Sequence, residues 1–201
     1  MNESVLRNAL ELRRAGRLAE AAELYGQILR TEPRHFEALH ALGILRFQSG
    51  QLEDAERLIG QAVSVNPTAA EALYHRASLL QRLNRPEDAL MHYARAIAAR
   101  PDFAEALTNR AILLMGLGRL PDALADFDRV LALRPDFADA WRGRGSILSA
   151  LGRLDLALQS FERALALNPN DADAQRQRAD ALLAMSRATD ARTRSEEHTS
   201  E

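Results

Sequence analysis

Small and large apolar residues recur along this chain at positions 34 residues apart. Counted in units that start at residue 2, the eighth and twentieth positions are Ala or Gly, whereas the fourth and twenty-fourth are large apolar or aromatic residues. Small residues let two helices approach closely, so the pattern predicts paired helices in which large side chains enter the spaces beside small ones. The small positions are Ala9, Gly43, Ala77, Ala111, Gly145 and Ala21, Ala55, Ala89, Ala123, Ala157. The large positions are Val5, Leu39, Leu73, Leu107, Trp141 and Tyr25, Ile59, Tyr93, Phe127, Phe161.

Proline and glycine divide these units into two helices each. Pro33, Pro67, Pro101, Pro135 and Pro169 close five units without insertion or deletion: 2–35, 36–69, 70–103, 104–137 and 138–171. The fifteenth position holds Gly16, Gly50, Asn84, Gly118 and Gly152, which are residue types that tolerate positive φ and end helices. We therefore expect a first helix to end there and a second to begin two or three residues later. Capping residues are expected before the first helices at Thr68, Asp102, Asp136 and Asn170.

A sixth unit begins at Ala172 and is cut short. It keeps small residues at Ala179 and Ala191 and places its turn position at Ser186. The last eight residues, "RSEEHTSE", match one translation of a widely used sequencing adapter and interrupt this unit. We expect a helical-repeat domain over residues 1–193, with a partial repeat over 172–193, and a non-native tail over 194–201 that is poorly ordered or frayed, without packing partners.

The motif W-x2-L-G-x2-Y, followed by A-x3-F and a closing Pro, is approximated in these units. The second unit has "LHALG" and the fifth "WRGRG", while "DALADF" and "LALQSF" carry the A-x3-F spacing. Over about residues 2 to 191 the chain resembles the tetratricopeptide repeats. The resemblance implies an all-α, right-handed superhelical solenoid of antiparallel helix pairs, with first helices lining a concave groove. The eleventh position departs from the family's aromatic residue and holds Leu12, Arg46, Leu80, Leu114 and Leu148.

The resemblance also implies which positions of each unit face the groove. Transferred to this chain, these positions predict a partner-binding set: His40, Ile44, Phe47, Glu71, Tyr74, His75, Ser78, Gln81, Arg82, Glu105, Thr108, Asn109, Ile112, Met115, Asp139, Arg142 and Ser146. Phe47, Tyr74 and Met115 are either partner anchors or packing between helices. The carboxylate clamp of some family members is not matched, since only Arg142 could contribute, and the asparagine ladder of another subfamily is reduced to Asn109.

Charged residues and histidines add further candidates along the repeats. Arginines recur at the seventh position (Arg76, Arg110, Arg144, Arg178) and acids at the second (Glu3, Glu37, Glu71, Glu105, Asp139, Asp173). For both ladders we favour intramolecular pairing and helix-dipole stabilisation over a charged track for a partner. His40 and His75 could face each other across adjacent units. Two ligands make a poor metal site, so neither a metal nor a cofactor is expected.

Composition excludes several classes of function. Acidic residues number 28 and basic residues 26, interspersed in sign, which argues against a nucleic-acid or membrane surface. All basic residues are Arg, which suggests a high-GC bacterial genome. The absence of Lys and Cys excludes a Walker-type lysine, a Schiff base and a thiolate nucleophile. No catalytic motif is present, and no apolar run reaches about 18 residues, so we expect a non-enzymatic, cytoplasmic chain.

These observations favour a protein–protein interaction module that holds a peptide or protein partner in the concave groove and does no chemistry. The alternative, implied by resemblance, is the N-terminal substrate-recognition region of a larger enzyme, either an O-linked N-acetylglucosamine transferase-like glycosyltransferase or a sulfotransferase. An assembly scaffold for a cell-envelope or secretion complex is a third hypothesis.

Overall fold

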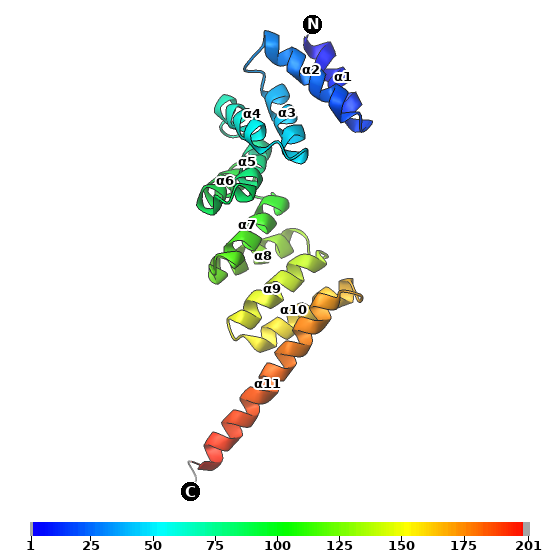
Figure 1. The fold of residues 1–201 in the computed structure, drawn as a ribbon. Coiled ribbons are helices and arrows are strands. Elements are labelled where there is room, and N and C mark those ends of the chain that lie inside the picture. Colours follow the sequence, from blue (N-terminus) through cyan, green and yellow to red (C-terminus); the bar gives the residue numbers. More distant parts are fainter. Residues whose placement is uncertain (1, 199–201) are drawn as a thin grey trace. The chain divides into compact units, whose positions relative to one another are not determined.

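The computed structural model describes residues 2–198, and the side chains of residues 2–187. Within that range the chain forms eleven helices and no strand, so the all-α prediction is confirmed (Figure 1). The chain divides into two compact units, residues 1–106 and 107–201. The first unit contains α1 (Asn2–Arg14), α2 (Leu18–Thr31), α3 (Phe36–Gln48), α4 (Leu52–Val65), α5 (Ala70–Arg82), α6 (Pro86–Ala99) and the start of α7 (Ala104–Gly116). The second contains the rest of α7, then α8 (Leu120–Leu133), α9 (Ala138–Ala150), α10 (Leu154–Leu167) and α11 (Ala172–His198).

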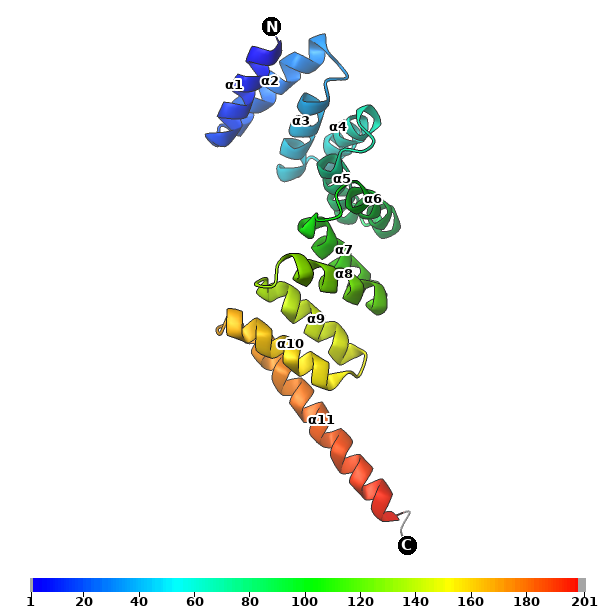
Figure 2. The ribbon, with the colours of Figure 1, turned by 180° about the vertical axis from the view of Figure 1, so that it is seen from behind.

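The expected turns between the two helices of each repeat are confirmed. Gly16, Gly50, Gly118 and Gly152 have φ between 72° and 78°, and Asn84 has φ of 57°. A side chain with a Cβ is disfavoured in this left-handed region, and Asn is the residue that best tolerates it after Gly. The chain therefore reverses direction at the same point of each of the five repeats, and in the pairs α1–α2, α3–α4, α5–α6 and α9–α10 the second helix packs back against the first (Figure 2).

Close packing between paired helices depends on the small residues, as predicted. A Cβ added to Gly43 would lie 2.6 Å from Cγ1 of Ile59, and one added to Gly145 would lie 2.5 Å from Cε1 of Phe161. Both partners are fully buried, with no exposed surface on Ile59 or Phe161. The small residue at the eighth position of a repeat, on its first helix, thus contacts the large side chain at the twenty-fourth position, on its second helix. This contact sets how closely the two helices can approach.

The capping prediction is wrong at Thr68, Asp136 and Asn170. The residues that precede α5 and α9 directly are Ala69 and Phe137, and neither makes a side-chain cap. Thr68 instead donates hydrogen bonds from its hydroxyl and its backbone N–H to Oδ1 of Asn66. Before α11, Asp171 rather than Asn170 accepts the hydrogen bond, from the backbone N–H of Ala174 at 3.0 Å. The first helices begin one residue later than expected, so the cap position falls after the polar residue.

The sixth repeat does not turn at Ser186. Helix α11 continues without a break from Ala172 to His198. Serine lacks the conformational freedom of the Gly or Asn that stands at this position in the other repeats, so nothing at Ser186 favours a left-handed turn. The backbone is helical through His198. The prediction that residues 194–201 lack packing partners concerns side chains that lie outside the described residues.

Candidate functional site

The predicted groove residues lie on the first helices of the repeats, α3, α5, α7 and α9, and none of them is buried. Six side chains are exposed: Glu71, Gln81, Arg82, Glu105, Ile112 and Asp139. The other eleven are half-buried: His40, Ile44, Phe47, Tyr74, His75, Ser78, Thr108, Asn109, Met115, Arg142 and Ser146. The partial exposure of a polar and apolar mixture is compatible with a contact surface.

In the first unit, five rings form one continuous row, which we call the ring row: Phe36, His40, His75, Tyr74 and Phe103. The Phe36 and His40 rings stack with centroids 5.7 Å apart, and His40 meets His75 edge-on at 5.0 Å. Tyr74 lies 5.2 Å from His75 and 5.1 Å from Phe103. The guanidinium of Arg100 covers the Phe103 ring at 3.5 Å. Offset and edge-on ring contacts of this kind are favourable, so the row is fixed before any partner arrives.

The two histidines at the centre of the row are locked in defined tautomers. Nδ1 of His75 lies 2.8 Å from the Glu71 carbonyl oxygen, which can only accept, so this nitrogen carries the proton. The same nitrogen lies 3.0 Å from Nε2 of His40, which must then be an acceptor. The proton of His40 is therefore on Nδ1. Nε2 of His75 is left as a lone pair with no hydrogen bond to the described residues.

Both histidines are held neutral at pH 7. The pKa of His40 is lowered to about 4, mainly by burial and also by the neighbouring His75 and the positive charge of Arg13, against the opposing carboxylate of Glu71. Burial is also the main cause that lowers the pKa of His75. The centre of the ring row is therefore an uncharged surface with one available hydrogen-bond acceptor.

Tyr74 and Phe47, the two predicted aromatic anchors, differ in their surroundings. Tyr74 lies 6.0 Å from the fully buried ring of Tyr93, whose hydroxyl donates to Oε1 of Gln81 at 3.2 Å. Phe47 packs against a buried cluster formed by Ala55, Ile59 and Leu79. Phe47 therefore contributes to the packing between α3, α4 and α5, whereas Tyr74 belongs to the ring row.

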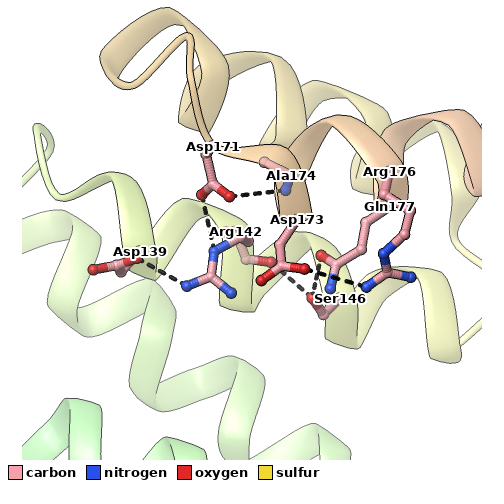
Figure 3. A network of polar contacts seen from close by, with 8 residues as sticks. All are labelled: Asp139, Arg142, Ser146, Asp171, Asp173, Ala174, Arg176 and Gln177. Atoms are coloured by element: carbon pink, nitrogen blue, oxygen red, sulfur yellow. Dashed lines mark hydrogen bonds and ion pairs between the residues drawn. The ribbon is translucent and has the colours of Figure 1, made fainter.

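In the second unit the predicted residues form a polar network instead of a ring row (Figure 3). Arg142 donates from Nη2 to Asp139 at 2.9 Å, and this hydrogen bond is the main cause that raises the pKa of Arg142. Nε of Arg142 lies 3.0 Å from Oδ2 of Asp171 in an ion pair that lacks the alignment of a hydrogen bond. The Ser146 hydroxyl lies 2.8 Å from Oε1 of Gln177. Arg142 and Ser146 thus connect α9 to α11 and its cap.

Three of the four ladder arginines, Arg76, Arg110 and Arg144, make hydrogen bonds inside the fold, as favoured above. Arg110 makes two hydrogen bonds of 2.7 Å to Asp126, which is almost fully buried. Arg144 donates to Asp128 at 2.7 Å and to Ser160 at 2.8 Å. The acids of the second position lie in the first turn of their helices, where a negative charge is stabilised by the helix dipole.

Arg76 differs from the other ladder arginines because its partner is a histidine. Nε of Arg76 donates to Nε2 of His92 at 3.2 Å, and His92 is only 6% exposed. Burial lowers the pKa of His92 to about 4, helped by the positive charges of Arg76, Arg95 and Arg85 and opposed by Asp88. His92 must therefore stay neutral to accept this hydrogen bond.

We expect stability to rise with pH between about 4 and 6.5, and His92→Gln to make that rise shallower, while His40, whose pKa is also lowered to about 4, still contributes to it. The unfolded chain protonates His92 near its ordinary pKa of 6.5, whereas the folded chain does so only at about 4, so acid favours unfolding in this window. The contribution of one such histidine is at most about 3 kcal/mol. Gln cannot titrate but can still accept from Arg76. Urea denaturation at a series of pH values measures the slope; an unchanged slope in the variant would contradict the assignment.

The sequence resembles a known protein family over most of its length. It matches the family described as "Tetratricopeptide repeat" over residues 74–129, 108–172 and 144–195, and a second model of that description over 12–83. The chain belongs to the tetratricopeptide repeat family. The fold of these repeats supports protein–protein interaction, which places the coarse function of the chain among binding modules.

Solved tetratricopeptide repeat structures share this fold. MamA is 24% identical, with a TM-score of 0.75, over 82% of this chain and 96% of its own. YrrB, described as a TPR protein with an unusual peptide-binding site, is 22% identical with a TM-score of 0.76, over 86% and 89%. A tetratricopeptide repeat protein from Parabacteroides merdae is 26% identical with a TM-score of 0.77, over 96% and 76%. No curated protein matches the sequence.

Tetratricopeptide positions alone did not predict the two ends of the ring row. Phe36 and Phe103 stand at the first and last positions of their units, outside the groove positions that the family implies. The sequence "RPDF" occurs at 100–103 and again at 134–137, and in both copies the Arg covers the Phe ring. That repeated tetrapeptide is the signal that could have identified Phe103.

Among residues with described side chains, no group of three His, Asp or Glu residues is arranged to hold a metal ion. Within the described part of the chain, no helix is both long and apolar enough to span a bilayer.

Proposed function

We propose that this chain is a non-catalytic interaction module that binds a peptide or protein partner on the face formed by its first helices. The observation that carries the proposal is the ring row of the first unit. Its five rings come from α3, α5 and the residue before α7, and all are in contact from one ring to the next. Phe103 is only 7% exposed and supports the row from below, so the surface offered to a partner is made by the half-buried rings of Phe36, His40, His75 and Tyr74. A preformed surface loses little conformational entropy on binding, so more of the contact energy remains as affinity.

Polar groups beside the row would fix the register of the partner. The lone pair on Nε2 of His75 can accept one backbone or side-chain N–H from a peptide. Ser78 and Gln81 lie one and two turns further along α5, where both contact the Tyr93 hydroxyl. The description of YrrB as a peptide-binding repeat protein adds support from a protein of the same fold.

The test uses random peptides displayed on phage and selected on the wild-type chain. Tyr74→Ala removes the ring that joins His75 to Phe103, and we expect the selected peptides to bind it at least about tenfold more weakly, a loss of about 1.4 kcal/mol. Tyr74→Phe keeps the ring and should retain most of the affinity. Fluorescence anisotropy measures binding, and circular dichroism checks that both variants remain helical.

Two results would contradict the proposal. Full-strength binding to a folded Tyr74→Ala chain would show that the ring row is not the contact surface. Equal losses in Tyr74→Ala and Tyr74→Phe would assign the effect to the hydroxyl group instead of the ring.

A further inference from the structure

A second candidate surface lies in the first unit, between α2 and α3. Two adjoining hollows of about 350 and 550 Å³ share Ala19, Ala22 and Arg46 in their walls. We call the combined depression the α2–α3 furrow. Its other walls include Gly26 on α2 and Leu42 and Leu45 on α3. No residue of the ring row lines either hollow, so the furrow is a separate surface.

The furrow exists because α2 presents small residues where later repeats carry larger ones. Ala22 stands where the third, fourth and fifth repeats have Leu90, Leu124 and Leu158. A Cβ added to Gly26 would meet no atom within 4 Å, whereas the equivalent Gly60 is covered by the guanidinium of Arg76. Ala19, Ala22 and Gly26 are spaced i, i+3 and i+7, so they line one face of α2.

On the α3 side, a leucine and an arginine have exchanged places. The seventh and eleventh positions are Arg then Leu in the third, fourth and fifth repeats, but Leu42 and Arg46 in the second. Leu42 does not reach across to Gly26 as Arg76 does to Gly60, and this leaves the furrow open. Arg46 is displaced by one turn to the wall of both hollows, where it donates to the Gln51 side chain at 2.5 Å.

The charges of the furrow point to the chemistry of its occupant. Arg46 and Arg30 line the depression, and neither makes an ion pair with the residues whose side chains are described. One acidic residue, Glu23, lies in the same wall, so the balance is positive. The floor is apolar, with Leu42 and Leu45 each 7% exposed. A matching partner has an apolar stripe with carboxylates beside it.

We propose that the α2–α3 furrow binds an acidic amphipathic helix of a partner protein. Small residues on α2 allow a third helix to approach closely, and the seven-residue span from Ala19 to Gly26 covers about 10 Å, or two helical turns. An apolar helix face laid in a groove with i, i+3 or i+4, and i+7 contacts is an established mode of recognition. Carboxylates at the edge of this helix pair with Arg46 and Arg30.

The test uses a display library of helical peptides selected on the wild-type chain. Ala22→Leu restores the residue of the later repeats and fills the furrow, so it should fold normally. The exchange Leu42→Arg with Arg46→Leu restores their arginine–leucine order. We expect the selected peptides to have acidic flanks and to lose at least about tenfold in affinity for both variants. Gln61→Leu, which adds a leucine at an exposed position of α4, and Tyr74→Ala, in the ring row, should bind them as the wild type does.

Four outcomes would overturn the proposal. Selection that yields no peptide sensitive to Ala22→Leu would show that the furrow binds no helix. Selected peptides with basic instead of acidic flanks would contradict the role of the two arginines. Sedimentation that shows the wild type to self-associate, with Ala22→Leu abolishing that association, would identify the occupant as a second copy of this chain. Losses confined to Tyr74→Ala would support the proposed function and leave no role for the furrow.

Discussion

Asp126→Ala should lower the free energy of unfolding by about 3 kcal/mol. Removing one partner of a buried ion pair costs about 3 to 5 kcal/mol because the remaining charge is left without compensation. Asp126 is 3% exposed at its side chain, and it receives both hydrogen bonds from Arg110, which is 21% exposed. Urea denaturation followed by circular dichroism measures the loss as a shift of the midpoint.

Asp122→Ala is the matched control on the same helix. Asp122 also pairs with an arginine, Arg119, at 2.9 Å, but the two side chains are 58% and 50% exposed. Exposed ion pairs contribute about 0 to 1 kcal/mol, so this variant should remain close to the wild type. If both substitutions cost the same, burial is not what makes the Arg110–Asp126 pair important.

Gly145→Leu should also cost about 3 kcal/mol, because the added side chain enters space that Phe161 already fills. Overpacking of a core costs about 1 to 3 kcal/mol, and the ring is rigid and fully buried, so it cannot move aside. Gly116→Leu is the control, since a Cβ there meets nothing within 4 Å. Thermal and urea unfolding of the two variants should differ clearly.

A double variant tests whether the cost at Gly145 comes from this contact. Combining Gly145→Leu with Phe161→Ala should recover part of the loss, because the leucine can occupy the space that the ring vacates. Strictly additive losses would show that the glycine is required for some other reason.

Much of the fold could be predicted from the sequence because each repeat satisfies the same requirements at the same positions. Gly16 and its equivalents end a helix through backbone conformation alone, and Gly43 and Gly145 accept a neighbour because they lack a Cβ. The polar residues before the helices were less informative. Thr68 could cap a helix or bond to Asn66, and the local competition between these two hydrogen bonds decided against the cap.

The candidate sites depended more on the arrangement of helices. The groove positions implied by the family include His40, Tyr74 and His75. Phe36 joins the row through His40, one turn along the same helix, whereas Phe103 joins it because the segment before α7 packs beside Tyr74 of α5. The exchange of Leu42 and Arg46 was visible in the sequence as a departure at the eleventh position. That it opens a furrow depends on the small residues of α2, a helix contributed by the preceding repeat.

By itself the sequence determined the number of complete repeats, the turns at positive φ and the pairing of small with large residues. These are decided within one repeat by steric limits on the backbone and on adjacent side chains. Only the tertiary structure decided that Nε2 of His75 is free to accept, that His92 stands buried beside Arg76, and that α2 and α3 leave a furrow between them. Burial, pKa and open volume depend on how close the atoms of neighbouring repeats lie. A pattern of residue types along the chain does not specify the distances between these atoms.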